Sequence, residues 1–167
     1  MSLRWREKLT SVLAGASRVV FLGVGNEAKG DDAAGVLAVR RLRGLLPPGR
    51  EGRADILLLD GGDVPESTTG PIRRFAPDWT VIIDAAVGGH PPGTVFIPAR
   101  DKIADEGVST HTISLLYLVR YLEESIGSRV VVLGIEPEDL SLGAPVSAAV
   151  SAAIDEIVEF FDGHFYK

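Results

Sequence analysis

Residues 19–35, VVFLGVGNEAKGDDAAG, join a strand-like apolar run to a glycine-rich loop and two adjacent carboxylates, Asp31 and Asp32. The apolar run predicts a strand buried on both faces, and the glycines allow a backbone or a ligand to approach closely. A glycine loop between a strand and a helix is also typical of a phosphate cradle. The two acids oppose that interpretation, because they stand where the negative charge of a phosphate would lie. The function that this stretch predicts depends on whether the glycine loop binds a phosphate or the two acids bind a different ligand.

Strand-like and helix-like segments alternate along the whole chain. Apolar strands interleaved with helices are typical of a mostly parallel sheet with helices on both faces, so we expect an α/β fold with about five strands. The expected strands are residues 19–24, 54–59, 80–85, 94–97 and 129–134. The expected helices are residues 31–46, 112–124 and 145–161, with an amphipathic N-terminal segment carrying Leu3, Leu9, Val12 and Leu13.

Two boundaries follow from the same pattern. Asp60-Gly61-Gly62 is expected to end the second strand, because aspartate and glycine favour turns. We expect residues 1–17 to form an N-terminal helical extension and residues 18–167 to form a single α/β domain.

The composition indicates a globular protein and excludes several kinds of site. The 167 residues carry a formal net charge of -6, which argues against a nucleic-acid partner. The chain has no cysteine, so disulfides, thiolate metal sites and a cysteine nucleophile are excluded. No segment approaches the roughly 18 consecutive apolar residues that span a bilayer, and the apolar part of the N-terminal segment is short for a signal peptide. We therefore expect a cytoplasmic protein with no membrane partner.

A dinucleotide site fits the glycine loop poorly. Gly23, Gly25 and Gly30 miss the GxGxxG spacing, and no P-loop lysine follows them. Asp60 would have to serve as the ribose-binding acid, yet it lies about thirty residues beyond the loop instead of roughly 20. Nucleotide binding is therefore disfavoured.

Acidic and imidazole side chains gather instead at the expected carboxyl edge of the sheet, where ligands of parallel α/β folds bind. Asp32 follows the first expected strand, Asp84 ends the third, and His111 precedes the helix expected from residue 112. Two carboxylates and a neutral imidazole form a donor set for a divalent metal with open coordination positions. Asp31 is interpreted as an N-cap or first-turn residue of its own helix, where a structural role as a cap suffices to explain it. His90 is the reserve metal ligand.

No protein nucleophile stands out. The GxSxG motif and the DTG or DSG loops of aspartic proteases are absent from the sequence. Glu66 and Glu136 are candidate general bases, although a glutamate after a proline is more typical of a helix start.

Five short motifs stand in order along the chain: LGVGNEAKGDDAAG at residues 22–35, DGGDVPE at 60–66, VIIDAA at 81–86, STH at 109–111 and LGIEPED at 133–139. With these motifs in this order, the chain resembles the hydrogenase maturation endopeptidases over residues 19–161. Members of that family remove a C-terminal extension from the large subunit of nickel–iron hydrogenases.

The resemblance implies a three-layer α/β/α sandwich of the phosphorylase/hydrolase-like type. It implies that Asp32, Asp84 and His111 are both the catalytic residues and the metal ligands. The metal would be nickel supplied by the substrate, the hydrogenase large-subunit precursor, with cadmium or zinc as substitutes in vitro. The expected substrate-binding residues are Gly25, Asn26, Gly30, Asp60 and Glu66.

The chain departs from the family pattern at two places. Ala33 stands where the family usually has glycine, and Gly70-Pro71 interrupts a segment expected to be helical in relatives. Two other functions remain open. One is a non-catalytic accessory protein that binds a hydrogenase subunit without cutting it, and the other is a flavodoxin-like domain that binds a small ligand or a nucleotide.

Overall fold

The computed structural model describes residues 2–45, 52–103 and 112–166, and within them five strands form one sheet of order β2-β1-β3-β5-β4. Strands β1, β2, β3 and β5 are parallel, and β4 pairs antiparallel with β5 at one edge. Their bounds are Arg18–Val24 for β1, Asp55–Gly62 for β2, Trp79–Ala85 for β3, Val95–Phe96 for β4 and Arg129–Ile135 for β5. The expected mostly parallel sheet is confirmed.

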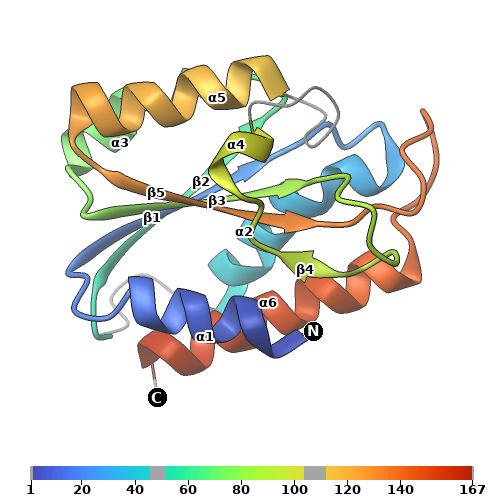
Figure 1. The fold of residues 1–167 in the computed structure, drawn as a ribbon, viewed down its shortest axis with the longest axis horizontal. Coiled ribbons are helices and arrows are strands. Elements are labelled where there is room, and N and C mark those ends of the chain that lie inside the picture. The colour runs from blue at the N-terminus through green and yellow to red at the C-terminus, as the bar shows by residue number, and fades with distance from the viewer. Residues whose placement is uncertain (1, 46–51, 104–111, 167) are drawn as a thin grey trace.

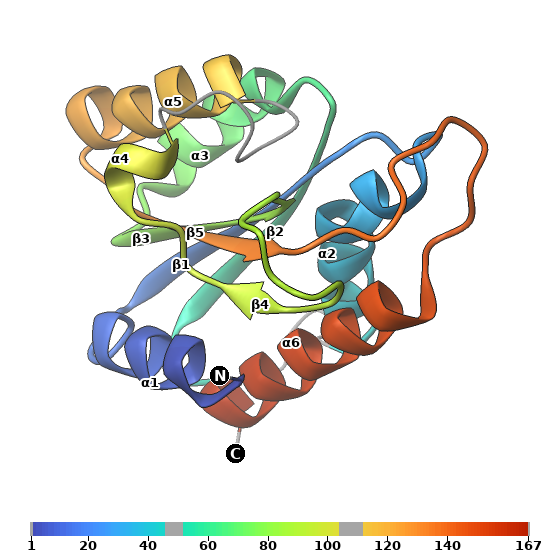
Figure 2. The ribbon, with the colours of Figure 1, turned by 45° about the vertical axis from the view of Figure 1, so that its right-hand side comes forward.

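Helices cover both faces of this sheet, as Figures 1 and 2 show. One face carries α3, α4 and α5, and the other carries α1, α2 and α6. The α-helices are α1 Ser2–Val12, α2 Ala34–Leu45, α3 Thr69–Phe75, α4 Arg100–Ile103, α5 Thr112–Tyr121 and α6 Ala148–Tyr166. Three shorter helical turns are the 3₁₀ helices η1 Gly30–Ala33 and η2 Pro65–Thr68 and the π-helical turn η3 Leu122–Ile126. The expected three-layer sandwich is thereby confirmed.

Alternate residues of the strands divide the core into two layers. Phe21 of β1 faces α6, where its ring meets that of Phe161 edge to face with centroids 4.5 Å apart. Its neighbour Leu22 faces the other way and packs in the layer that contains Leu115 of α5. Burial on both faces explains why the central strands are apolar at nearly every position. None of the helices in the described part of the chain is long and apolar enough to cross a membrane.

The N-terminal helix α1 buries a different set of side chains from the one predicted. Leu9 and Leu13 are buried as expected, but Leu3 is 68% exposed and Trp5 takes its place in the core. Trp5 belongs to the same core layer as α6, where its ring lies 5.1 Å from that of Phe160. The large indole ring buries more apolar surface than leucine would, which sets the rotation of the helix.

Two predicted interruptions were wrong. Strand β2 continues through Asp60 and Gly61 to Gly62, because the parallel ladder uses backbone groups and Asp60 still pairs with Gly23. Helix α3 forms across Gly70 and Pro71, because a proline in the first helical turn has no intrahelical N–H bond to lose.

At the amino edge of the sheet, Asp78 connects the three central strands. Its carboxylate accepts N–H bonds from Ser17 at 2.6 Å and Arg18 at 2.9 Å. Its own N–H donates to the carbonyl of Arg18, and its carbonyl accepts the N–H of Arg129. The Ser17 and Arg18 N–H groups hold the pKa of the Asp78 carboxyl below its ordinary value.

Replacing Asp78 by alanine should lower the free energy of unfolding at pH 7, because two N–H groups lose their carboxylate acceptor. Since the pKa is lower in the folded chain, this contribution is complete above the unfolded pKa of about 3.9 and disappears as the pH falls through the folded pKa. Denaturant titrations of both proteins should show the difference narrowing in acid. A difference that is the same at pH 7 and pH 2 would contradict this role.

Candidate functional site

The carboxyl edge of the parallel strands brings two buried carboxylates onto neighbouring elements. Asp84 lies near the end of β3 with 0% of its surface exposed, and Asp32 lies in η1 with 2% exposed. Helix η1 follows β1 after the glycine loop of residues 25–29 and packs against β3, the strand next to β1. Carboxylates are almost never buried without partners that offset the loss of water, so two at one edge mark a specialised place.

Glycines create the close approach that positions these acids. A Cβ atom at Gly25 would lie 1.8 Å from the carbonyl oxygen of Asp32, and one at Gly35 would lie 2.0 Å from that of Ile83. A Cβ at Gly23 would lie 2.3 Å from the carbonyl oxygen of Gly35. No side chain fits at these three positions, so the start of α2 can press directly onto β1 and β3.

Asp32 closes the glycine loop. Its Oδ2 accepts the N–H of Asn26 at 2.9 Å, and its own N–H donates to the carbonyl of Lys29 at 3.0 Å. The side-chain Oδ1 of Asn26 accepts the N–H of Ala28 at 2.9 Å, which folds the loop back on itself. Ala33 follows with a negative φ, so alanine is accommodated where the family usually has glycine.

Asp31 has a different role from the one predicted. It lies in the first turn of η1, one of the two predicted positions, but it does not cap that helix: Lys29 is at the N-cap, and no side chain caps that end. The buried Asp31 carboxylate instead accepts the N–H groups of Glu138, Asp139 and Ser147 at 2.7–3.1 Å and the Ser147 hydroxyl at 2.9 Å. It therefore holds the loop between β5 and α6, up to the residue before α6.

Gly30 takes part in the same junction. Its φ is +54°, and a Cβ there would lie 2.4 Å from the carbonyl oxygen of Asp139. The N–H of Asp31 donates to that same carbonyl at 2.8 Å. Gly30 is therefore required by the packing of two loops, whatever it also does for a ligand.

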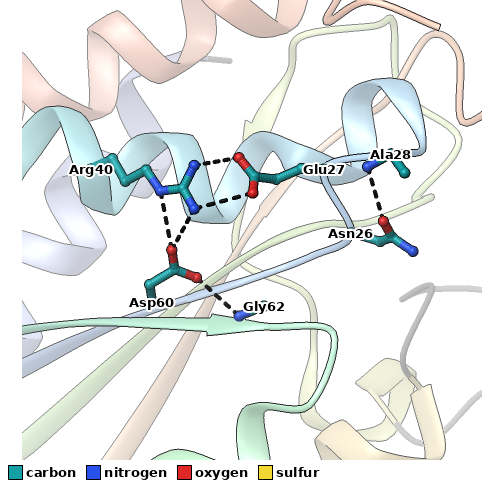
Figure 3. A network of polar contacts seen from close by, with 6 residues as sticks. All are labelled: Asn26, Glu27, Ala28, Arg40, Asp60 and Gly62. Carbon is teal, nitrogen blue, oxygen red and sulfur yellow. Dashed lines mark hydrogen bonds and ion pairs between the residues drawn. The ribbon is translucent and has the colours of Figure 1, made fainter. Parts of the chain in front are cut away.

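Asp60 belongs to an ion-pair network on the exposed side of the loop, drawn in Figure 3. The guanidinium of Arg40 in α2 bridges Asp60, at 2.8 Å, and Glu27 of the glycine loop. Asp60 Oδ1 also accepts the N–H of Gly62 at 3.1 Å. Hydrogen bonds to Glu27, and then to Asp60, raise the pKa of Arg40 above its ordinary value. The network connects the glycine loop to the end of β2.

The two candidate general bases occupy unlike environments. Glu66 is exposed in the first turn of η2 directly after Pro65, as expected of a helix-start glutamate. Glu136 is 5% exposed, and its Oε2 accepts the N–H of Gly88 at 2.7 Å. Glu136 therefore connects the end of β5 to the loop that follows Asp84.

Of the two predicted imidazoles, only that of His90 lies within the described residues, and it does not group with the acids. His111 lies outside the described residues, and the helix that it precedes, α5, begins on the side where the parallel strands end (Figure 1). His90 packs on Phe96 with ring centroids 4.6 Å apart and lines a cavity beside α1. Within residues 2–45, 52–103 and 112–166, no three His, Asp or Glu side chains are grouped closely enough to hold a metal ion. The trio of Asp32, Asp84 and His111 remains a prediction.

Sequence reasoning missed the roles of Asp31 and Glu136 as connectors of loops. Nothing local marks either role, because both residues bind N–H groups that are distant in sequence, such as those of Ser147 and Gly88. For Asp31, the one available signal was its position directly beside Asp32, an acid already assigned to the site.

Comparisons with known proteins agree with this architecture. The sequence profile described as hydrogenase maturation protease matches residues 42–162. A putative hydrogenase maturation protease of Methanocaldococcus jannaschii is 32% identical over 155 residues, 92% of this chain and 91% of the relative. The hydrogenase 3 maturation protease of Escherichia coli K12 is 33% identical over 145 residues, 86% and 88% of the two chains. The crystal structure of a NiFe hydrogenase maturation protease from Thermococcus kodakarensis superposes with a TM-score of 0.81 at 33% identity, covering 94% of this chain and 97% of that one.

Replacing Asp31 by asparagine should lower the free energy of unfolding by about 3 kcal/mol, because an amide NH₂ would face buried N–H donors. Urea titration at pH 7 measures this effect. The matched control is Asp139→Asn, because Asp139 is exposed and its Oδ1 accepts the Ser141 N–H, which an amide oxygen can also accept. We expect the control to change stability by no more than about 0.5 kcal/mol. Equal effects of the two substitutions would contradict the structural role of Asp31.

Replacing Gly35 by alanine should cost about 3 kcal/mol or more, because the new methyl group would overlap the Ile83 carbonyl. Gly44, near the other end of α2, would place a Cβ in open space with nothing within 4 Å, so Gly44→Ala should stabilise the chain by about 0.5–1 kcal/mol. Thermal unfolding of both variants tests the comparison. Opposite signs are expected, and a mild effect at Gly35 would contradict the close approach.

Proposed function

The chain belongs to the hydrogenase maturation protease family, and from that premise we propose that it removes the C-terminal extension of a nickel-loaded NiFe-hydrogenase large-subunit precursor. The proposal rests above all on the burial of two carboxylates, Asp32 and Asp84, on neighbouring elements at the carboxyl edge of the sheet. A nucleotide would meet repulsion at this edge, whereas a metal-bearing peptide would find oxygen donors.

The donor chemistry fits nickel carried by the substrate. Carboxylate oxygens and imidazole nitrogen bind divalent first-row metals, and a protein that offers only part of a coordination shell can share a metal with its substrate. Asp32 and Asp84 would supply the oxygens, and His111 would supply the nitrogen. Ligands from the precursor would complete the shell, and cadmium or zinc would occupy the same donors in vitro.

Cleavage of the peptide bond needs a water molecule and positioning. The water oxygen forms a bond to the carbonyl carbon, the C–N bond breaks, and the leaving amine takes up a proton. The metal of the substrate would polarise the carbonyl or the water. The sequence contains no recognised nucleophile motif that would give the same assistance. Asp32 and Asp84, held on packed elements, would fix the metal relative to the scissile bond.

The glycine loop would orient the peptide. Gly25 lets the loop pack on the backbone of Asp32, and Gly30 lets it pack on the loop after β5. The side-chain NH₂ of Asn26 is the group available to meet a peptide carbonyl, since its oxygen accepts the Ala28 N–H. Asp60 would act together with Arg40, and Glu66 from the exposed start of η2 would contact the precursor at the rim.

The test is a processing assay with purified precursor and a mass measurement of the product. Nickel-loaded precursor should lose its extension, and nickel-free precursor should not. Asp32→Asn and Asp84→Asn should each lower the rate at least 100-fold, because each removes a charged metal donor. Asp155→Asn is the matched control, since this exposed acid of α6 pairs with Arg41 on the surface and its loss should leave processing normal.

The same assay distinguishes a protease from a non-catalytic accessory protein. A stable complex with precursor that never changes mass would identify an accessory protein and contradict the proposal. Full activity of Asp32→Asn or Asp84→Asn would contradict the assignment of the site. Circular dichroism spectra matching the parent would show that a loss of activity in either variant is not a loss of fold.

A further inference from the structure

A cavity of about 270 Å³ lies between α1 and the edge strand β4. Helix α1 contributes Arg4, Trp5 and Lys8, the loop after β3 contributes His90, and residues 94–97 form the remaining wall. Figures 1 and 2 both show α1 running beside β4. None of the residues given a role in the proposed cleavage lines this cavity.

The charge of the cavity is positive. Arg4 and Lys8 are exposed and lie one helical turn apart, so they share a face of α1. No acidic side chain lines the cavity, and neither cation forms an ion pair with any residue in the described parts of the chain. An anion could therefore bind both without displacing a partner, in a chain whose net charge is -6.

Trp5 lines the cavity from the side of the core. Trp5 is only 3% exposed, and its indole Nε1–H meets no hydrogen-bond acceptor among the residues that the structure describes. The Nε1 atom itself lies beneath the surface, so Trp5 offers the cavity the surface of its ring and not a hydrogen bond.

The remaining wall is apolar. Val95 is buried, Phe96 and Ile97 are half-buried, and the His90 ring covers one side of Phe96. A purely inorganic anion would leave this wall uncovered, whereas a ligand with an apolar body would remove it from water. The volume is slightly below the roughly 300 Å³ at which ordinary small-molecule pockets begin, which suits a single ring or branched chain.

We propose that this cavity binds an organic carboxylate with an apolar body. The carboxylate pairs with Arg4 and Lys8, and the apolar part packs on Phe96 and Ile97 beside the Trp5 ring. A free small acid and the C-terminal residue of a polypeptide share this chemistry. The proposal does not depend on the protease activity, because binding here can be measured without precursor.

The test uses Trp5 as its own reporter. The chain has two tryptophans, so Trp79→Phe leaves Trp5 as the only one. Titration with phenylacetate should give a saturable change in fluorescence, and phenylacetamide, its neutral analogue, should bind at least about fivefold more weakly. The double variant Arg4→Gln, Lys8→Gln should weaken phenylacetate binding to a similar degree. The control Arg73→Gln, Arg74→Gln removes the same charge from α3 on the opposite face and should leave binding unchanged.

A second pair of probes identifies the source of the carboxylate. Gly-Gly-Phe with a free C-terminus is compared with the same peptide amidated. Preference for the free peptide assigns the site to a chain terminus, and binding of phenylacetate without the peptide assigns it to a small acid. Equal affinity for acid and amide, no saturable signal with either acid, or unchanged affinity in the Arg4 and Lys8 variant would overturn the proposal.

Discussion

The contact of backbone with backbone at Gly23, Gly25 and Gly35 is the constraint on which the rest of the structure depends. At each of these positions a β-carbon would overlap a carbonyl oxygen of a neighbouring segment, by far more than side-chain adjustment could relieve. The glycines let the first turns after β1 lie directly on β1 and β3. Asp32 therefore reaches the edge where β3 ends, one residue after Asp84, without any long side chain spanning the gap.

The adjacent acids Asp31 and Asp32 show how one short segment serves two purposes. Asp31 turns toward the loop after β5 and accepts four hydrogen bonds there, so its charge is used by the architecture. Asp32 turns toward the glycine loop and the carboxyl edge, where it accepts the N–H of Asn26. The paired acids that oppose a phosphate are thus not equivalent, and only the second is a candidate for chemistry.

The sequence predicted the sheet and its layers well, because strands buried on both faces show as continuous apolar runs such as those ending at Val24 and Ala85. It failed where distant contacts decide. Trp5 is buried in place of Leu3, against rings on α6. The side chain of Asp31, which stays within η1, binds donors of the distant β5–α6 loop such as Ser147 instead of capping η1. The residues Gly70-Pro71 and Asp60-Gly61-Gly62 predicted a break in a helix and the end of a strand. In the structure α3 nevertheless includes Gly70 and Pro71, and pairing with β1 continues β2 to Gly62.

The Glu136 contact with Gly88 joins the end of β5 to the loop after β3, and the Asp31 contacts join η1 to the β5–α6 loop. Both loops are held by a buried carboxylate instead of being left to move independently. These loops have already lost conformational entropy during folding, before a partner docks on this edge. Recognition there can depend on shape and charge, because little of the binding free energy is consumed in ordering loops.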